Sequence, residues 1–439
     1  MSTGERYRVG VDIGGTFTDI VFLGIDGVLH TRKISSTVDD YARAITDGLR
    51  EVFAKTGLGP GSVMELLHGT TVASNTILQL DGAKTGLITT RGFRDVLELR
   101  TLRMPRLYDI GWEKPTPLVP RYLRLEVDER VDTAGAVQRP LERGEVDTVV
   151  DSLLAEGVEA IAVCLLNSFA NSAHERLIGE AISQRAPGVA YCLSVDVLPE
   201  MKEYERTSTT VVNAYLLPVV ARYLESLLDE LASNEIDAPL LLMQSNGGLT
   251  TAERAAAAPC QIIESGPAGG VVGSHALATK LGLGDIVTFD MGGTTAKAAL
   301  VEDGEYTRAA DFSVGAGIIA GSRLLTGAGY RVKVPAIDLA EVGAGGGSII
   351  AIDAGGAMEV GPRSAGANPG PACYALGGTR PTVTDANVAL GYLNPEQLVD
   401  GAVRIDAGLS REALLKEVAE PLGLELERAA FGAHEIAAS

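Results

Sequence analysis

Hydrophobic and polar residues alternate at the start of the chain as they do in β-strands joined by tight turns. Three alternating segments, YRVGVDI, FTDIVFLG and VLHTRKI, lie within residues 7–34 and are separated by a Gly-Gly turn and an Asp-Gly turn. Short turns between such segments predict an antiparallel meander of three strands. Apolar residues then recur at helical spacing, which predicts a helix from about residue 39 to residue 56.

The rest of the chain contains both strand-like and helix-like segments. LLHGTTVASNTIL predicts a strand end, a polar turn and a helix start, KTGLITT predicts a strand, and VEAIAVCLL has the continuous apolar run of a strand buried on both faces. Residues 101–140 are rich in Pro and Arg and predict an irregular excursion. Residues 203–233 form a long helical pattern that Pro218 is expected to bend or break. This mixture predicts an α/β protein.

An internal repeat is the most informative feature of the sequence. The pattern D-x-G-G-T begins at Asp12 as DIGGT and again at Asp290 as DMGGT, 278 residues later. Each copy follows an apolar strand-like segment and precedes another that ends in an Asp-Gly turn. Repetition at this scale, in matching local structure, predicts two related halves that face each other.

The repeated motif has the chemistry of a phosphate-binding turn. A strand that ends in Asp and turns through two glycines leaves its backbone N–H groups open to a ligand oxygen, and the Thr hydroxyl adds a donor. Asp12 and Asp290 are candidate ligands, directly or through water, of the Mg²⁺ that accompanies a nucleotide. An ordinary hairpin turn is the alternative for each copy, but two copies followed by Thr favour a clamp on a polyphosphate. The predicted phosphate-binding residues are Gly14, Gly15, Thr16, Gly292, Gly293 and Thr294.

Two further segments are weaker candidates. Residues 264–270, ESGPAGG, open a helix, so the backbone at Gly266 could face an anion, although a plain helix start fits equally well. HGTT lies at a strand-to-helix turn, and His68, Thr70 and Asn75 are candidates for substrate contact, with a capping or core role as the alternative for the histidine. The chain contains no P-loop, G-x-S-x-G or H-E-x-x-H motif, and the glycine run at 343–347 lacks dinucleotide-binding spacing.

The composition of the chain argues against some classes of binding partner. A chain of 439 residues has room for two or three domains, and 57 acidic against 37 basic residues give a net charge of −20, which repels nucleic acids and anionic lipids. We therefore expect neither nucleic-acid nor membrane partners. The start of the chain lacks a signal-peptide pattern and no long apolar window stands out, so a cytoplasmic location is expected. The four cysteines lack metal-type spacing and are expected to be reduced core thiols.

Taken together, these motifs resemble the hydantoinase A / 5-oxoprolinase family, which includes N-methylhydantoinase A and the ATPase subunits of acetone and acetophenone carboxylases. The resemblance covers nearly the whole chain, and it is specific because many motifs occur in order. They are VDIGGTFTD, HGTTVASNTIL, TTRGFRDVLELR, NSFANSAHE, YERTSTTVVNAYLLP, MQSNGG, ESGPAGG, FDMGGTTAK, VGAGGGSI, GPRSAGANPGPACY and PTVTDAN.

The resemblance implies an actin-like ATPase fold, of the kind shared with sugar kinases and heat-shock ATPases. It extends the two phosphate motifs to Thr18 and Thr295. It also implies that ATP activates a carbonyl oxygen by phosphorylation, in a lactam or imide before ring opening or in a ketone enolate before carboxylation. Positioning and Mg²⁺ carry most of such phosphoryl transfer, so a shortage of nucleophilic side chains is no objection. The resemblance further implies a hydantoinase B-like partner, as a separate subunit or as a domain, since this is usual in the family.

Two departures from the family pattern matter. Where relatives carry Gly-Arg-Gly-Gly after PGPACY, this chain has ALGG at residues 375–378, so an expected cation is missing. Relatives also continue past the equivalent of Ser439 with a Gly-rich adenosine-binding segment, so the second half is expected to be incomplete. A separate chain that carries this segment, a truncated sequence and incomplete nucleotide binding are the three alternatives.

We therefore predict an N-terminal domain over residues 1–195 and a second domain over residues 196–439, with ATP and Mg²⁺ in the cleft between them. The predicted function is ATP-dependent hydrolysis of a hydantoin, a lactam or 5-oxoproline, with this chain as the component that binds ATP and phosphorylates the substrate carbonyl. One alternative is the ATPase subunit of a ketone carboxylase, and another is a non-catalytic assembly subunit.

Overall fold

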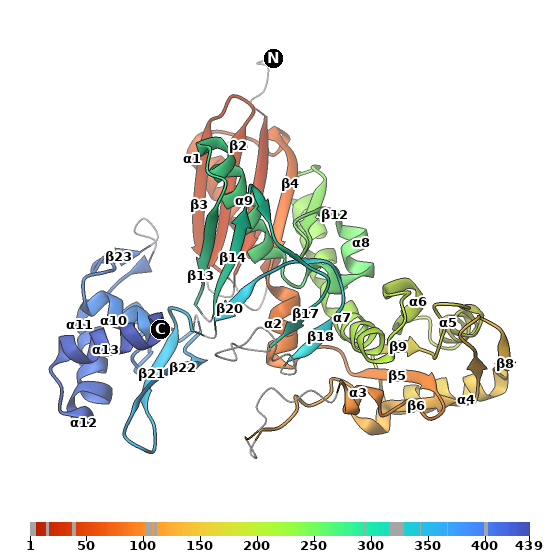
Figure 1. The fold of residues 1–439 in the computed structure, drawn as a ribbon. Helices are drawn as coiled ribbons and strands as arrows, with labels where there is room; N and C mark the ends of the chain where they lie inside the picture. Colours follow the sequence, from red (N-terminus) through yellow and green to blue (C-terminus); the bar gives the residue numbers. More distant parts are fainter. Residues whose placement is uncertain are drawn as a thin grey trace.

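The chain is a mixed α/β protein (Figure 1). The structure is a computed structural model, and it describes residues 6–14, 17–36, 41–101, 108, 112–293, 295–315, 329–342, 344–366, 368–398 and 403–439. Three of the predicted phosphate-binding residues, Gly15, Thr16 and Thr294, lie outside the described residues.

The largest sheet has six strands in the order β12-β11-β4-β1-β2-β3. The predicted meander is confirmed, since β1 pairs antiparallel with β2 and β2 pairs antiparallel with β3. β4 pairs parallel with β1, and β11 pairs parallel with β4, so the carboxyl ends of these three strands lie at one edge of the sheet. The strands are β1 (Tyr7–Ile13), β2 (Phe17–Gly24), β3 (Leu29–Ser35), β4 (Val63–Thr70), β11 (Leu240–Met243) and β12 (Leu249–Thr251).

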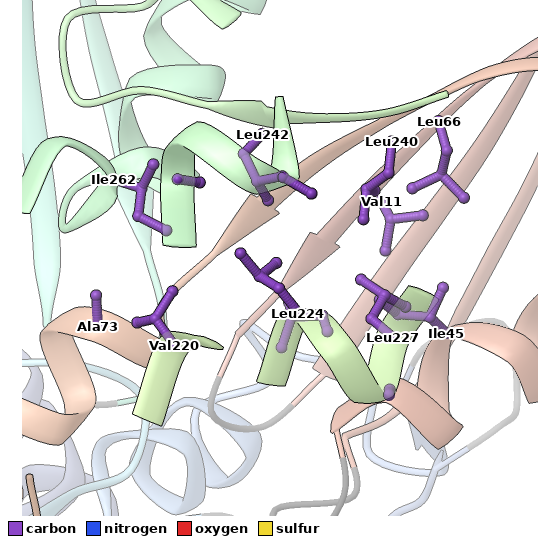
Figure 2. Packing of buried hydrophobic residues seen from close by; sticks show 14 of the residues in the cluster. Val11, Ile45, Leu66, Ala73, Val220, Leu224, Leu227, Leu240, Leu242 and Ile262 are labelled. Carbon is purple, nitrogen blue, oxygen red and sulfur yellow. The ribbon is translucent and has the colours of Figure 1, made fainter. Parts of the chain in front are cut away.

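Two helices bury one face of this sheet. α1 (Tyr41–Thr56), which confirms the helix expected over residues 39–56, and α7 (Glu203–Ser233) share a hydrophobic core with the strands. Figure 2 shows Val11, Leu66 and Leu240 of the sheet facing Leu224 and Leu227 of α7. Every second residue of β1 is buried in this core, so the strand that carries Asp12 is held firmly in place.

α7 is one uninterrupted helix of 31 residues. It continues through Pro218 without the expected break, because residues on both sides of the proline are buried in the cores of two different sheets, and this packing outweighs the hydrogen bond that proline removes. By length and composition α7 could cross a membrane, yet most of its apolar stretch is buried inside the protein. That burial is typical of the core helix of a folded domain.

The segment between α2 (Val72–Gln79) and α7 forms a second sheet, in which all neighbouring strands are parallel, in the order β10-β9-β5-β6. Every residue of β9 is buried, which confirms the strand predicted from VEAIAVCLL. Figure 1 shows this sheet and its helices across α7 from the large sheet. Its elements are β5 (Thr85–Thr90), α3 (Val96–Leu99), β6 (Arg124–Val127), β7 (Arg130–Val131), β8 (Val137–Arg139), α4 (Arg143–Ala155), β9 (Ala160–Cys164), α5 (Ala173–Arg185), β10 (Ala190–Leu193) and α6 (Ser194–Val197).

The second copy of the repeated motif lies in a smaller antiparallel sheet. β13 (Ile286–Met291) pairs with β14 (Ala296–Glu302), which also pairs with β15 (Glu305–Tyr306) and β20 (Ala340–Val342). α9 (Ser265–Leu281) follows α8 (Ala252–Ala257) and contacts β4 and β11 of the large sheet as well as β13 and β14. α9 therefore connects the two sheets that carry the repeated motif.

The remaining elements extend this second region. Two short strand pairs join β16 (Arg308–Ala309) with β19 (Ala336–Ile337) and β17 (Phe312–Val314) with β18 (Tyr330–Val332). The last part of the chain packs a hairpin against a small helical core (Figure 1). Its elements are β21 (Ser348–Ile352), β22 (Met358–Ser364), α10 (Val383–Ala389), β23 (Gln397–Leu398), β24 (Val403–Arg404), α11 (Ala407–Leu414), α12 (Glu420–Leu422) and α13 (Leu426–Ala438).

The large sheet combines strands from both sides of residue 195, because β11 and β12 come after the parallel sheet in the sequence. The division into residues 1–195 and 196–439 therefore stays a prediction. The four cysteines are all buried and free, as predicted for core thiols.

Candidate functional site

The first copy of the motif forms a tight loop between β1 and β2. Ile13 pairs with Thr18, so residues 14–17 make the connection. The Gly14 N–H donates to the Phe17 carbonyl over 2.9 Å and closes the loop. The Ser36 hydroxyl donates to the Gly14 carbonyl over 2.8 Å, which fixes the loop from the outside.

The second copy has the same geometry between β13 and β14. Met291 pairs with Ala296, and the Gly292 N–H donates to the Thr295 carbonyl over 2.9 Å. The two loops therefore match in strand register, in length and in the hydrogen bond that closes them. The similarity inferred from five letters of sequence therefore extends to the strand pairing and the closing hydrogen bond of both hairpins.

Asp12 lies near the end of β1, where backbone crowds around its carboxylate. A Cβ atom added at Gly69 of β4 would lie 2.9 Å from Asp12 Oδ1, and one added at Gly266 of α9 would lie 3.0 Å from the same oxygen. A Cβ atom at either position would crowd the carboxylate, so glycine lets Asp12 Oδ1 keep its place. The strand pairing Asp12–Gly69 and the start of α9 thus define where Asp12 can point.

The charges around Asp12 favour a cation. Asp12 remains open to solvent, yet protein surrounds it on most sides. This desolvation, followed by the negative charges of Asp19 and Asp290, raises the pKa of the Asp12 carboxyl from 3.8 to about 6, with Lys33 acting in the opposite direction. Asp290 therefore lies close enough for its charge to act on Asp12, and a shared site for the two aspartates stays a prediction.

Asp290 faces a different partner across its own hairpin. Lys297 occupies the position opposite Asp290, whereas Asp19 occupies the corresponding position opposite Asp12. The Lys297 side chain is 12% exposed and forms an ion pair with Glu264, the residue before α9. Burial alone would lower the pKa of the Lys297 ammonium, but Glu264, Glu341 and Asp290 hold that pKa above its ordinary value. Sequence reasoning missed Lys297, although it ends the motif FDMGGTTAK.

The start of α9 is fixed to the end of β4. The Ser265 hydroxyl donates to the Thr70 carbonyl and accepts from the Thr70 N–H, each over 2.8 Å. This pair of bonds places the first turn of a 17-residue helix, including Gly266, beside Asp12. A helix N-terminus presents free N–H groups and a partial positive charge, which suits an anion.

The glycine-rich segment after β20 supports the second hairpin. The Gly346 N–H donates to the Gly292 carbonyl over 3.0 Å, and the Gly347 N–H donates to the Gly293 carbonyl over 2.7 Å. A Cβ at Gly347 would lie 2.9 Å from the Gly293 carbonyl oxygen, so the close approach requires glycine. The segment thus fixes the second loop instead of forming a dinucleotide-binding turn.

His68, Thr70 and Asn75 are placed near the site, but their polar groups are engaged within the protein. The buried His68 donates from Nδ1 to the Val11 carbonyl over 3.2 Å and accepts from the Tyr223 hydroxyl at Nε2. Burial lowers the pKa of His68 to about 4, with the Val11 bond acting in the opposite direction, so the ring is neutral at pH 7. The Thr70 hydroxyl accepts from the Val72 N–H.

Asn75 and Thr18 also act on their own surroundings. The Asn75 amide donates to the Thr71 hydroxyl, which in turn donates to the Ile13 carbonyl. Thr18 is buried, and its hydroxyl bonds with Ser36 over 3.0 Å. These contacts favour structural roles, and the substrate and phosphate contacts assigned to these residues stay predictions.

The donor set suits Mg²⁺ held together with a polyphosphate. Among the residues that the structure describes, no group of three or more His, Cys, Asp or Glu side chains is arranged to hold a metal on its own. Mg²⁺ is commonly bound by one or two carboxylates together with phosphate oxygens and water. Asp12 and Asp290 are the two candidate carboxylates, and phosphate binding by the hairpin loops stays a prediction.

Comparisons with known proteins agree with the motifs. The model of the hydantoinase/oxoprolinase family matches residues 206–439, and the model of the family's N-terminal region matches residues 8–186. The chain is 37% identical over 439 residues to caprolactamase subunit alpha of Pseudomonas jessenii, and the match covers 98% of this chain and 60% of that protein. It is 36% identical over 446 residues to the acetophenone carboxylase gamma subunit of Aromatoleum aromaticum, covering 96% and 58%.

Among solved structures, the chain is similar to nucleotide-free acetone carboxylase, described as a structure for the mechanism of ATP-dependent acetone carboxylation. The TM-score is 0.84 at 28% sequence identity, and the match covers 98% of this chain and 61% of the other. The chain therefore spans between 58% and 61% of the length of these three relatives.

Proposed function

Because this chain belongs to the hydantoinase/oxoprolinase family, we propose that it is the ATP-binding component of an enzyme that hydrolyses a cyclic amide with the help of ATP. The candidate substrates are a hydantoin, a lactam and 5-oxoproline, and the relative named caprolactamase supports this class. The observation that carries the proposal is the matched pair of hairpins, with Asp12 and Asp290 at equivalent positions and the charge of Asp290 acting on Asp12.

Each group of residues in the proposed site has its own role in binding or catalysis. The Gly14 and Gly292 N–H groups close the two loops, so the proposed phosphate donors are the N–H groups at residues 15–16 and 293–294. The first turn of α9 around Gly266 adds further donors. Asp12 and Asp290 hold Mg²⁺ and orient the attacking carbonyl group. ATP, when bound, supplies the phosphoryl group that activates the amide carbonyl oxygen for ring opening.

Lys297 is an additional positioning residue in this proposal. Its ammonium lies across the strand pair from Asp290 and is fixed by Glu264. Glu264 directly precedes α9, so the same ion pair joins the second hairpin to the helix that faces Asp12. The two motif copies are thereby held at a defined separation.

We further propose that the two halves belong to an actin-like ATPase fold. The matched hairpins and the helix between their sheets support this assignment, as does the similarity to acetone carboxylase over 98% of this chain. In the first half, β1 has β2 on one side and β4 on the other. In the second half, β14 is the one described strand that pairs with β13.

The exposed face of β13 supports a further segment, of this protein or of a partner chain, that covers the second half. Val9 and Val11 of β1 are 0% and 3% exposed, whereas the equivalent Val287 and Phe289 are each 67% exposed. Helices α1 and α7 cover the first pair, and no described element covers the second. The proposed occupant is a chain that adds a strand parallel to β13, with apolar helices, and that carries the adenosine-binding segment.

A hydantoinase B-like subunit is the second proposed partner. The relatives named caprolactamase subunit alpha and acetophenone carboxylase gamma subunit both belong to multi-subunit enzymes by their names. A cytoplasmic location is also proposed, and the four free, buried thiols agree with a reducing compartment.

Ketone carboxylation is the second candidate function, favoured by the TM-score of 0.84 to acetone carboxylase. Phosphate release from ATP, measured with the purified chain and its partner subunits, separates the two functions. Release that depends on a hydantoin, a lactam or 5-oxoproline and ignores bicarbonate supports hydrolysis. Release that requires a ketone and bicarbonate contradicts it and supports carboxylation.

A non-catalytic assembly role is the third candidate, and the uncovered β13 face is the feature that favours it. In that case the chain would bind its partner chains without binding nucleotide. Failure to bind ATP with Mg²⁺, even with the partner chains present, would support assembly over catalysis.

A further inference from the structure

Lys33 lies on the same face of the large sheet as Asp12. Asp12 pairs with Asp19 of β2, and Asp19 in turn pairs with Lys33 of β3. Residues directly opposite each other on neighbouring strands point to the same face of a sheet. Val11 and Ile20, which are neighbours of this row in sequence, lie in the core under α1 and α7. The row of three charged residues therefore faces away from that core.

The Lys33 ammonium lies at the first hairpin loop. Nζ donates to Asp19 Oδ2 over 2.6 Å and lies 5.2 Å from the centre of the Phe17 ring. Phe17 is the residue whose carbonyl accepts from the Gly14 N–H and closes the loop. The charge of Lys33 also acts on Asp12. The loop with the proposed phosphate donors thus has a cation beside it.

The ion pair between Lys33 and Asp19 is one that a ligand can replace. The two side chains are 37% and 45% exposed, and an ion pair between exposed side chains contributes little to stability. A lysine ammonium is a point charge with three N–H donors, and phosphate oxygens are strong acceptors for it. A polyphosphate at the loop would therefore compete well with a single exposed carboxylate.

Lys297, the lysine of the second hairpin, is held much more firmly. Its side chain is 12% exposed and pairs with Glu264, whose side chain is also 12% exposed. It lies opposite Asp290 on one neighbouring strand and opposite Glu341 on the other. Breaking a buried ion pair is strongly unfavourable, so this ammonium is not free to move to a ligand. Of the two lysines, Lys33 is the one suited to bind phosphate.

We propose that Lys33 binds a phosphate group of the nucleotide, a role that rests on the proposed function, and that this phosphate takes the place of Asp19. Before binding, the ion pair with Asp19 keeps the ammonium at the loop. On binding, Lys33 Nζ donates to a phosphate oxygen. Asp19 is then a competitor of the phosphate, because its carboxylate holds the same ammonium and repels the anion.

The two partners of this ion pair should have opposite effects on affinity. Calorimetric titration of the full chain, together with its partner chains, uses ATP with Mg²⁺ and, separately, inorganic tripolyphosphate with Mg²⁺. Lys33→Gln should weaken binding of both about tenfold, because a charge-assisted bond to phosphate is lost. Asp19→Asn should tighten binding of both, because it removes the competitor. A purely structural ion pair would instead give losses in both variants.

Two matched variants serve as controls. Lys33→Arg keeps the positive charge and should keep affinity within about threefold of the wild type, although its donors have a different geometry. Lys55→Gln removes the same charge from an exposed lysine in the last turn of α1 and should leave affinity unchanged. Urea unfolding verifies that each variant is folded.

The outcomes separate this role from the proposed function. Unchanged affinity in Lys33→Gln, with saturable binding by the wild type, would overturn the role of Lys33 alone. Weaker binding in Asp19→Asn would show a structural contact, whatever the result for Lys33→Gln, and would also overturn it. Absence of wild-type binding to both probes would contradict the proposed function, and the role of Lys33 with it.

Discussion

Asp12 and Asp290 occupy equivalent positions in two matched hairpins, but they face opposite charges. Asp12 has the carboxylate of Asp19 across the strand pair, whereas Asp290 has the ammonium of Lys297. The pKa of Asp12 is raised because desolvation and two neighbouring carboxylates all disfavour its ionised form. A cation bound between the aspartates would remove that penalty, which is why the pair suits Mg²⁺ better than an empty site.

The pKa of Asp12 gives a prediction for stability without ligand. Its folded-state pKa is about 6, above its ordinary value of 3.8, so ionisation of this group costs the folded state stability as the pH rises from about 4 through 6. Asn carries no charge at any pH. Asp12→Asn should therefore be more stable than the wild type at pH 8, with a smaller difference at pH 5. Urea unfolding at both pH values, without Mg²⁺, measures this, and an equal difference at both contradicts it.

Among the secondary-structure elements, helix α9 limits the directions in which the Asp12 side chain can point. Gly266 lies in its first turn against Asp12, whereas a Cβ added at Gly270, one turn later, would have no neighbouring atom within 4 Å. The two glycines belong to the same helix and differ only in their surroundings. They therefore form a matched pair for testing whether the carboxylate of Asp12 must stay where it is.

Gly266→Ala should weaken binding of ATP with Mg²⁺ several-fold, because the new methyl group lies 3.0 Å from Asp12 Oδ1 and displaces it. Gly270→Ala should leave binding unchanged and raise the free energy of unfolding by about 0.5–1 kcal/mol, as expected for glycine in a helix. Calorimetric titration and urea unfolding of both variants give these values. Equal nucleotide affinity in the two variants would contradict the role given to Gly266.

The elements themselves could largely be predicted from the sequence, because local patterns determine them. Alternation of apolar residues identified β1, β2 and β3, and the repeated D-x-G-G-T identified both loops. The relations between distant segments could not be predicted. Pro218 suggests a break that tertiary packing prevents, and no local signal in HGTT shows that both nitrogens of His68 are used inside the core.

The contacts between distant segments at the candidate site could not be predicted from local patterns either. Asp12 and Asp290 could be paired because their motifs repeat, but the ion pair between Lys297 and Glu264 joins residues 33 positions apart on different elements. The bonds between Ser265 and Thr70 join segments 195 positions apart. Such contacts depend on how sheets and helices pack, which no pattern within one segment contains.

At the scale of the whole molecule, the two halves are unequal. β1 lies inside a six-stranded sheet covered by helices, while β13 has a face that no described element covers. Equivalent positions of the repeat are buried in the first half of the chain and exposed in the second half. This inequality is the strongest structural support for a partner chain.

Val9→Asp and Val287→Asp test that inequality at equivalent positions. Val9→Asp places a charge in the core and should cost about 3 kcal/mol or more, or prevent folding. Val287→Asp should change the free energy of unfolding of the isolated chain by no more than about 0.5 kcal/mol, because Val287 is 67% exposed. With the partner chain present, Val287→Asp should weaken association, measured by co-purification. Similar large losses of stability in both variants would show that the β13 face is already covered.

The central claim is that the two hairpins form one site for ATP with Mg²⁺. Its most direct measurement is a calorimetric titration of the chain, together with its partner chains, with ATP and Mg²⁺. We predict saturable binding by the wild type and at least tenfold weaker binding by Asp12→Asn and by Asp290→Asn, each still folded. Absence of binding by the wild type, or unchanged affinity in both variants, would contradict the account.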